Sequence, residues 1–232
     1  MFHLGLLTPV LLFCAFLLLV LVTLSVPIIK TIFLFRLSAR ASSSLLKSSA
    51  SASVKFGVFG YCSSGIDVSI VGVNHDTAAE CSKAHLGYTF DDTVANALHV
   101  SGFENLISKS LTGVLALHPV VVALTFVTLL ISLFMLRRGA NGTSRLPSLL
   151  TLGIGLLTAI LTTIVFLIDV ILVAVVRNHV HKDTDGVLTL NWGNAVWMTL
   201  TATILLWIAM VGSCAGVCGG NKRRTRVDGE KY

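Results

Sequence analysis

Apolar residues gather in four long runs along the chain, and polar stretches separate these runs. They cover residues 4–29, 111–136, 149–176 and 194–217. An α-helix rises about 1.5 Å per residue, so about twenty apolar residues cross the hydrocarbon core of a bilayer. Each run is long enough for one crossing, and the pattern predicts a membrane all-α fold, a four-transmembrane-helix bundle. The long uncharged core of the first run is typical of a retained span rather than of a cleaved signal peptide.

The polar stretch 30–110 is the only sizeable region outside these runs, and its texture changes along its length. Residues 38–53 are mostly Ser and Ala, which predicts a flexible segment because such residues bury little apolar area. Residues 54–59 and 68–73 contain β-branched or aromatic residues between Gly and Ser, which predicts strands. Residues 91–110 carry apolar side chains mostly three and four positions apart, which predicts an amphipathic helix that leads into the second span.

Cysteine placement indicates how this loop is held together. Cys62 and Cys81 are its only two cysteines, and a pair in an oxidising, exoplasmic compartment normally closes. A disulfide enclosing about 19 residues would stabilise the loop by about 3 kcal/mol in the chain-entropy model. We therefore expect residues 54–90 to form a disulfide-closed, β-rich segment. Near the end of the fourth run, Cys214 and Cys218 are candidate palmitoylation sites, with inert thiols as the open alternative.

Composition argues against a soluble enzyme and against a nucleic-acid partner. The chain is 54% hydrophobic and only 12% charged, with a formal net charge of +6. Its cations lie in short clusters beside the apolar runs, which membrane topology explains better than a nucleic-acid surface does. The sequence contains no glycine-rich phosphate loop, no zinc-protease motif and no carboxylate pair placed for hydrolysis. We therefore expect no catalytic residue, no metal site and no cofactor, and we expect membrane lipids as partners.

The positions of the cations also predict the orientation of the chain in the membrane. The loop 137–148 and the basic tail 218–232 are rich in Arg and Lys, which favours the cytoplasmic side. Both termini are then cytoplasmic, and residues 30–110 and the short loop 177–193 are exoplasmic. Cations that follow the first span disagree with this orientation. However, long loops cross the membrane largely regardless of their charge.

Asp169 is the one acid in the middle of a predicted span. An ionised carboxylate at the bilayer centre costs at least about 2.5–3.5 kcal/mol, so this side chain is expected to face the bundle and to find a partner. It is interpreted either as a polar clamp between helices or as a titrating group. Its candidate neighbours are hydroxyl groups, on Thr162, Thr163, Thr199 and Thr201. Six histidines are expected outside or near the outer leaflet, as solvated side chains or as pH-sensitive groups: His75, His85, His99, His118, His179 and His181.

The residues around the first loop cysteine carry a more specific signal. Gly57, Phe59, Gly60, Tyr61 and Cys62, followed later by Cys81, resemble the Gly-x-Phe-Gly-x-Cys…Cys signature of the fungal claudin-like Sur/PalI tetraspanners. The apolar segment around Asp169 and the segment 192–200 resemble spans of the PalI-type fungal pH-response regulators. The resemblance implies a small claudin-like sheet on the helix bundle.

This resemblance also implies a function. It suggests a non-enzymatic plasma-membrane accessory protein of ambient, alkaline pH signalling, which supports the surface localisation of a separate multi-span pH sensor. The alternative is a Sur-type structural organiser of cortical, eisosome-associated plasma-membrane domains. In either role the chain also has polar helix faces on which a second copy could pack, so a homo-oligomer stays open.

Overall fold

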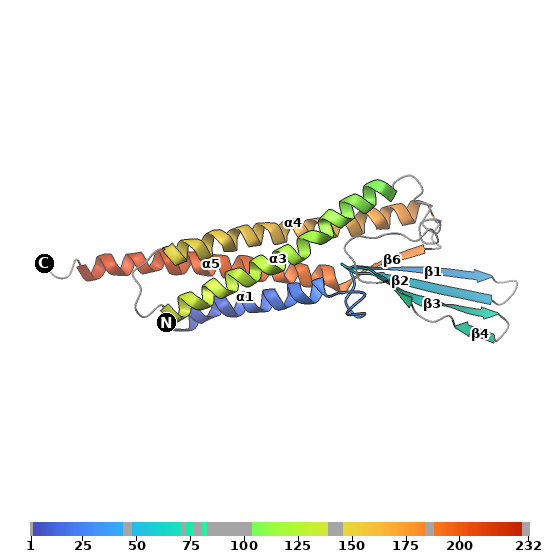
Figure 1. Cartoon of the computed structure of the whole chain (residues 1–232), viewed down its shortest axis with the longest axis horizontal. Coiled ribbons are helices and arrows are strands. Elements are labelled where there is room, and N and C mark those ends of the chain that lie inside the picture. Colours follow the sequence, from blue (N-terminus) through green and yellow to red (C-terminus); the bar gives the residue numbers. More distant parts are fainter. Residues whose placement is uncertain are drawn as a thin grey trace. The chain divides into compact units, whose positions relative to one another are not determined.

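The computed structural model describes residues 2–43, 48–70, 73–76, 80–82, 104–138, 146–183 and 188–228. The helices of this described part are α1 (Phe2–Thr23), α3 (Glu104–Arg138), α4 (Leu146–Asp183) and α5 (Asn194–Asp228) (Figure 1). Its strands are β1 (Phe35–Ser43), β2 (Ser48–Phe56), β3 (Tyr61–Ile70), β4 (Val73–Asp76), β5 (Glu80–Cys81) and β6 (Leu188–Trp192).

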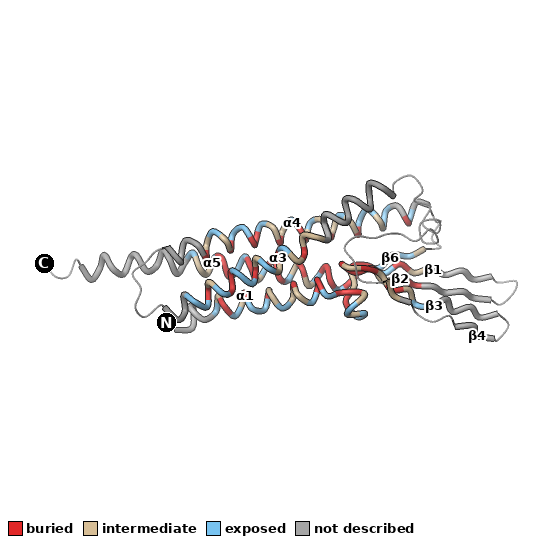
Figure 2. Tube along the Cα trace, viewed as in Figure 1, coloured by how far each residue is buried: buried red, intermediate tan, exposed pale blue. Residues whose placement is uncertain are grey.

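Three helices are long and apolar enough to cross a membrane. Their spanning segments are Ala116–Phe134 in α3, Thr151–Asn178 in α4 and Asn194–Cys214 in α5, and α1 contributes the shorter apolar segment Leu7–Thr23. Large apolar side chains stay exposed along them, including Phe134 at 63% and Val211 at 66%. Exposure of that extent suits contact with lipid rather than with water. Buried and exposed positions alternate along each described helix (Figure 2).

The chain divides into two compact units. The helical unit contains Met1–Val20, Pro119–Ile164 and Thr199–Tyr232, and the sheet unit contains Leu21–His118 and Val165–Met198. In the helical unit, polar side chains lie on the buried helix faces. Thr128 of α3 and Thr158 of α4 are fully buried, and their hydroxyl oxygens lie 3.4 Å apart. Trp207 of α5 donates its indole N–H to the hydroxyl oxygen of Thr163 on α4, at 3.1 Å.

The first helix ends at Thr23, earlier than the predicted span 4–29. Proline disfavours the helical conformation in the residue before it, so Pro27 prevents Val26 from continuing the helix. The Val26 N–H instead donates to the carbonyl of Ile32, at 3.0 Å. Residues 24–34 therefore form a turn-rich connection between α1 and the sheet.

Antiparallel pairing builds the sheet unit. In the described part of the chain the strand order is β4-β3-β2-β1-β6, and β5 pairs with β3 beside the other strands. Strand β6 comes from the predicted short loop 177–193 and pairs with β1, which places Trp192 opposite Phe35. In the same loop, α4 continues to Asp183. Two regions far apart in sequence thus share one sheet.

The Ser- and Ala-rich segment 38–53 differs from its prediction as a flexible segment. Most of it lies in β1 and β2, which pair in continuous register from Phe35 opposite Phe56 to Ser43 opposite Ser48. Small side chains do not drive this pairing. The backbone N–H and C=O groups of the segment instead find their partners in the hydrogen-bond ladder between β1 and β2. The first residues of β1 also pair with β6 on the other side.

Strand boundaries also differ from the pattern. The predicted strand 54–59 stops at Phe56, because the Gly57 N–H donates to the carbonyl of Gly60 and the chain turns there. The predicted strand 68–73 divides between the end of β3 and the start of β4. Of the predicted amphipathic helix 91–110, the part from Glu104 is helical and continuous with α3, and the remainder lies outside the described residues.

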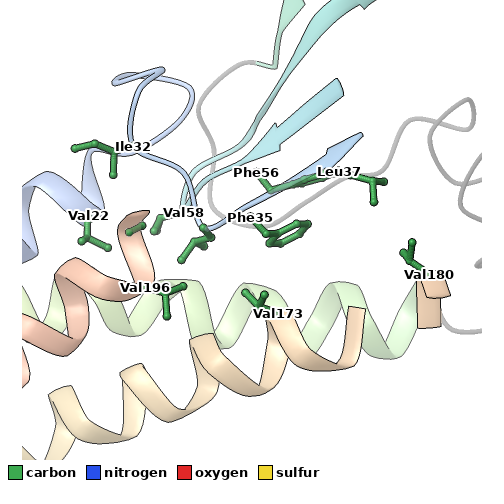
Figure 3. Packing of buried hydrophobic residues seen from close by; sticks show 11 residues of the cluster. Val22, Ile32, Phe35, Leu37, Phe56, Val58, Val173, Val180 and Val196 are labelled. Carbon is green, nitrogen blue, oxygen red and sulfur yellow. The ribbon is translucent and has the colours of Figure 1, made fainter. Parts of the chain in front are cut away.

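One face of the sheet is buried in a shared apolar core. The rings of Phe35 and Phe56 stack with centroids 4.6 Å apart and planes 16° from parallel. Val173 and Val180 of α4 and Val196 of α5 belong to the same cluster. Figure 3 shows the strand residues on one side of this cluster and the helix valines on the other. The packing therefore fixes the first turns of α5 and the end of α4 against the sheet.

Candidate functional site

The glycine-containing segment between β2 and β3 lies against the connection that follows α1. At Gly57 a Cβ atom would overlap the backbone nitrogen and oxygen of Val26, so only glycine allows this approach. The Val58 N–H donates to the hydroxyl oxygen of Ser25 at 2.9 Å, and both residues are fully buried. The segment therefore holds the sheet to the connection that follows α1, and it is not an exposed binding loop. This contact is the first of two structural joints of the sheet.

A disulfide and a hydrogen-bonded pair close the same segment on its other side. Cys62 and Cys81 form a disulfide with Cα atoms 4.0 Å apart. Next to it, Tyr61 and Ser82 exchange two bonds. The Tyr61 N–H donates to the Ser82 hydroxyl at 3.0 Å, and the Ser82 N–H donates to the Tyr61 carbonyl at 2.9 Å. Phe59 is partly buried against the core. The motif residues thus join β5 to β3 and orient the sheet.

The start of α5 forms a second joint with the connection after α1. The Asn194 side chain accepts the N–H of Phe33 at 3.1 Å and donates to the carbonyl of Thr31 at 3.0 Å. The Ala195 N–H, which has no partner within its own helix, donates to the Phe33 carbonyl at 3.1 Å. At Gly193 a Cβ atom would overlap the backbone of Phe33 and Leu34. These contacts explain why Gly193 and Asn194 stand at the start of the fourth apolar run.

Replacing Asn194 with alanine is expected to lower the melting temperature of the purified protein. The variant loses two partly exposed hydrogen bonds worth about 1 kcal/mol together, which corresponds to about 2–4 °C for a chain of this size. Asn191→Ala is the matched control, because Asn191 is exposed on the edge strand β6. Equal melting temperatures of the two variants would contradict the assigned role of Asn194.

The face of the sheet that points away from the core is basic and rich in hydroxyl groups. Arg36 of β1 lies directly opposite Lys55 of β2. Arg36 donates to the Ser53 hydroxyl at 2.9 Å, and the Lys55 nitrogen lies 5.5 Å from the centre of the Phe33 ring. The described side chains of this face include no acid that would neutralise the two cations. It is therefore a candidate surface for an acidic partner.

Asp169 has a partner that the sequence analysis missed. Its carboxylate oxygen lies 3.3 Å from the Nε2 atom of His118 on α3, and the two side chains are 1% and 2% exposed. Thr162 and Thr163, two of the expected neighbours, donate their hydroxyls to carbonyls of their own helix. The expectation that His118 is solvated is wrong, because it lies on the buried face of α3 with Val121 and Thr125. Their spacing of three and four residues was the available signal.

The structure shows fewer contacts for the other residues that the sequence suggested as sites. Cys214 is an exposed free thiol on α5, whereas the side chain of Cys218 lies outside the description. His181 is exposed on α4. No group of three or more potential metal ligands occurs within the described residues. Palmitoylation of Cys214 and Cys218 therefore stays a prediction.

Three apolar helices of spanning length, together with a small disulfide-bonded antiparallel sheet, are the features of a membrane protein. The model of the SUR7/PalI family matches residues 4–209, and the chain belongs to this family. The identification made from the Gly-x-Phe-Gly-x-Cys motif is thereby confirmed.

Three curated relatives of the chain are named pH-response regulators. The chain is 30% identical to the pH-response regulator protein palI/RIM9 of Emericella nidulans over 210 residues, which cover 89% of this chain and 30% of that protein. It is 28% identical to palI/prr-5 of Neurospora crassa, across 94% of this chain and 25% of that protein. It is 30% identical to palI/RIM9 of Yarrowia lipolytica, across 88% of this chain and 22% of that protein. The chain thus spans less than a third of the length of these relatives.

Proposed function

We propose that this chain is a non-enzymatic plasma-membrane protein of ambient, alkaline pH signalling, which keeps a separate multi-span pH sensor at the cell surface. The observation that carries the proposal is the similarity to three proteins named pH-response regulators, which covers 88–94% of this chain. Because the match leaves most of each relative uncovered, only functions of the shared membrane region are transferred.

The geometry supports a role in binding rather than in chemistry. The sheet is held by backbone contacts at two joints, the glycine-containing segment after β2 and the start of α5. Its outward face carries Arg36 and Lys55, which are available to a partner. Like charges directly opposite each other destabilise a sheet, so an acidic partner would relieve an existing repulsion. We propose that this face, together with the exposed apolar helix faces, contacts the sensor.

The proposed arrangement is a claudin-like tetraspanner with α1 as the fourth span, both termini in the cytoplasm and the sheet on the exoplasmic side. The disulfide within the sheet supports this orientation, because disulfides persist in oxidising compartments. The cations of the predicted cytoplasmic segments 137–148 and 218–232 support it as well.

The sequon Asn141-Gly142-Thr143 tests the orientation. It lies in the loop proposed to be cytoplasmic, so Asn141 is expected to stay unglycosylated. Wild-type protein and Asn141→Gln should migrate identically before and after glycosidase treatment. A glycosidase-sensitive shift that disappears in Asn141→Gln would invert the orientation.

Deletion of the gene tests the function. Cells without this chain should grow normally in acid medium and poorly at alkaline pH, and a copy of the wild-type chain should restore growth. The same cells should show normal cortical patches. Normal alkaline growth and signalling without the chain would contradict the proposal.

A second function is favoured by the family match itself, which covers both SUR7-type and PalI-type proteins. A cortical organiser would give stable, long-lived patches of the fluorescently tagged chain. Its loss would alter the patches and increase sensitivity to wall stress at every pH. Uniform surface fluorescence with a defect confined to alkaline medium favours the pH-signalling role instead.

A further inference from the structure

His118 and Asp169 form a buried acid–base contact between two membrane-spanning segments. His118 lies within Ala116–Phe134 and Asp169 within Thr151–Asn178, and the distance between His118 Nε2 and Asp169 Oδ2 is 3.3 Å. Among the described residues, neither the ring nitrogens nor the carboxylate oxygens have a well-directed hydrogen bond. Each side chain therefore depends on the charge of the other rather than on a network of donors and acceptors.

Few other titratable groups are available to this pair. The described side chains of α1 and α5 include only the thiols Cys14 and Cys214, and both are exposed. On α4 the exposed Arg177 lies two helical turns beyond Asp169. On the sheet, the cations Arg36 and Lys55 lie on the face that points away from the apolar core. Among the described residues, the contact of His118 and Asp169 has no third charged partner.

Protonation decides whether the contact is an ion pair. A protonated imidazole compensates the charge of a buried carboxylate, whereas a neutral imidazole leaves that charge uncompensated and costly. Imidazoles titrate in the range of pH that an ambient-pH pathway must distinguish.

The contact is also connected to the packing of the sheet. Asp169 and Val173 lie four residues apart on one buried face of α4, and Val173 belongs to the core that holds Phe35 and Phe56. A small displacement of α4 at Asp169 therefore also moves Val173, one helical turn away, and with it the packing of α4 against the sheet. Close packing transmits such displacements because the core has little free volume.

We propose that His118 and Asp169 form a proton-binding site that couples pH to the packing of α3, α4 and the sheet. At acid pH the bound proton keeps the ion pair and stabilises the packed state. At alkaline pH loss of the proton weakens the contact between α3 and α4 and loosens the packing of Val173. The use of this site in signalling rests on the proposed function, whereas the dependence of the protein's stability on pH does not.

Thermal unfolding of the purified full chain in lipid nanodiscs tests the site, with measurements at about pH 5.5 and about pH 8.5, on either side of the usual imidazole range. The melting temperature of the wild-type protein is expected to fall from the lower to the higher pH. His118→Gln and Asp169→Asn should each lose most of this difference, and the double variant should lose no more than either single variant. His181→Gln is the matched control and should keep the wild-type difference, because His181 is exposed outside the contact.

Two outcomes overturn the proposal. One is a wild-type melting temperature that does not change with pH, whatever the variants do. The other is a folded His118→Gln protein that keeps the wild-type difference. If the single variants do not fold, a swapped protein with His118→Asp and Asp169→His retains both groups and should keep the pH dependence. Normal alkaline growth of cells without the chain would contradict the proposed function alone, because unfolding of the purified protein does not depend on signalling.

Discussion

Gly57→Val is expected to remove almost all of the protein from the cell surface. The added side chain would overlap the backbone of Val26, and no rotation of a side chain relieves an overlap with backbone. The connection after α1 must then move, which breaks the buried bond between Val58 and Ser25. Overpacking typically costs about 1–3 kcal/mol and occasionally more, and an overlap with backbone lies at the upper end of this range. A marginally stable membrane protein with such a defect is retained and degraded during biosynthesis.

Gly153→Val is the matched control for this prediction. Gly153 lies on α4, and an added Cβ atom would meet no other heavy atom within 4 Å. Fluorescence microscopy of tagged proteins and surface labelling should find Gly153→Val at wild-type abundance and Gly57→Val inside the cell. Wild-type surface abundance of Gly57→Val would show that the glycine joint does not hold the sheet.

Loss of the disulfide is expected to have an effect of similar size. Cys62→Ser removes the covalent link between β3 and β5, which is worth about 3 kcal/mol in the chain-entropy model for a loop of this length. The remaining thiol at Cys81 also becomes available for wrong pairing. We expect retention during biosynthesis, visible as loss of surface protein and a shortened half-life.

Cys214→Ser controls for the loss of a cysteine as such, because Cys214 carries a free, exposed thiol. It should leave surface abundance unchanged in these assays. Alkylation of the surface-resident wild-type protein should label neither Cys62 nor Cys81 until reductant is added. Labelling of both thiols without reductant would contradict the disulfide-closed sheet.

Local patterns in the sequence predicted those features that depend on local chemistry. Long apolar runs gave the helices that become α3, α4 and α5, because spanning a bilayer imposes a length on each run. The spacing of Gly57, Gly60 and Cys62 indicated the family, since close backbone contacts and a disulfide tolerate few other residues there. The fixed spacing of these residues can be read from the sequence, whereas the contacts that require them, with Val26 and Cys81, are seen only in the structure.

Features that depend on distant partners could not be predicted in this way. The Ser- and Ala-rich segment 38–53 lies mostly in strands because β1 pairs with β2 next to it and, over Phe35–Ala39, with β6 about 150 residues later in the chain. The partner of Asp169 was missed for a related reason. A single histidine near the start of an apolar run does not indicate which helix its side chain faces. Only the packing of α3 against α4 brings His118 to Asp169.

The proposal to test first is that this chain keeps a pH sensor at the cell surface. Its most direct test is the amount of tagged sensor at the plasma membrane in cells with and without the chain, measured by surface labelling in acid and in alkaline medium. We expect a several-fold loss of surface sensor without the chain, unchanged total synthesis of the sensor, and recovery when the wild-type chain is returned. Equal amounts of surface sensor in both strains, with intact alkaline signalling, would contradict it.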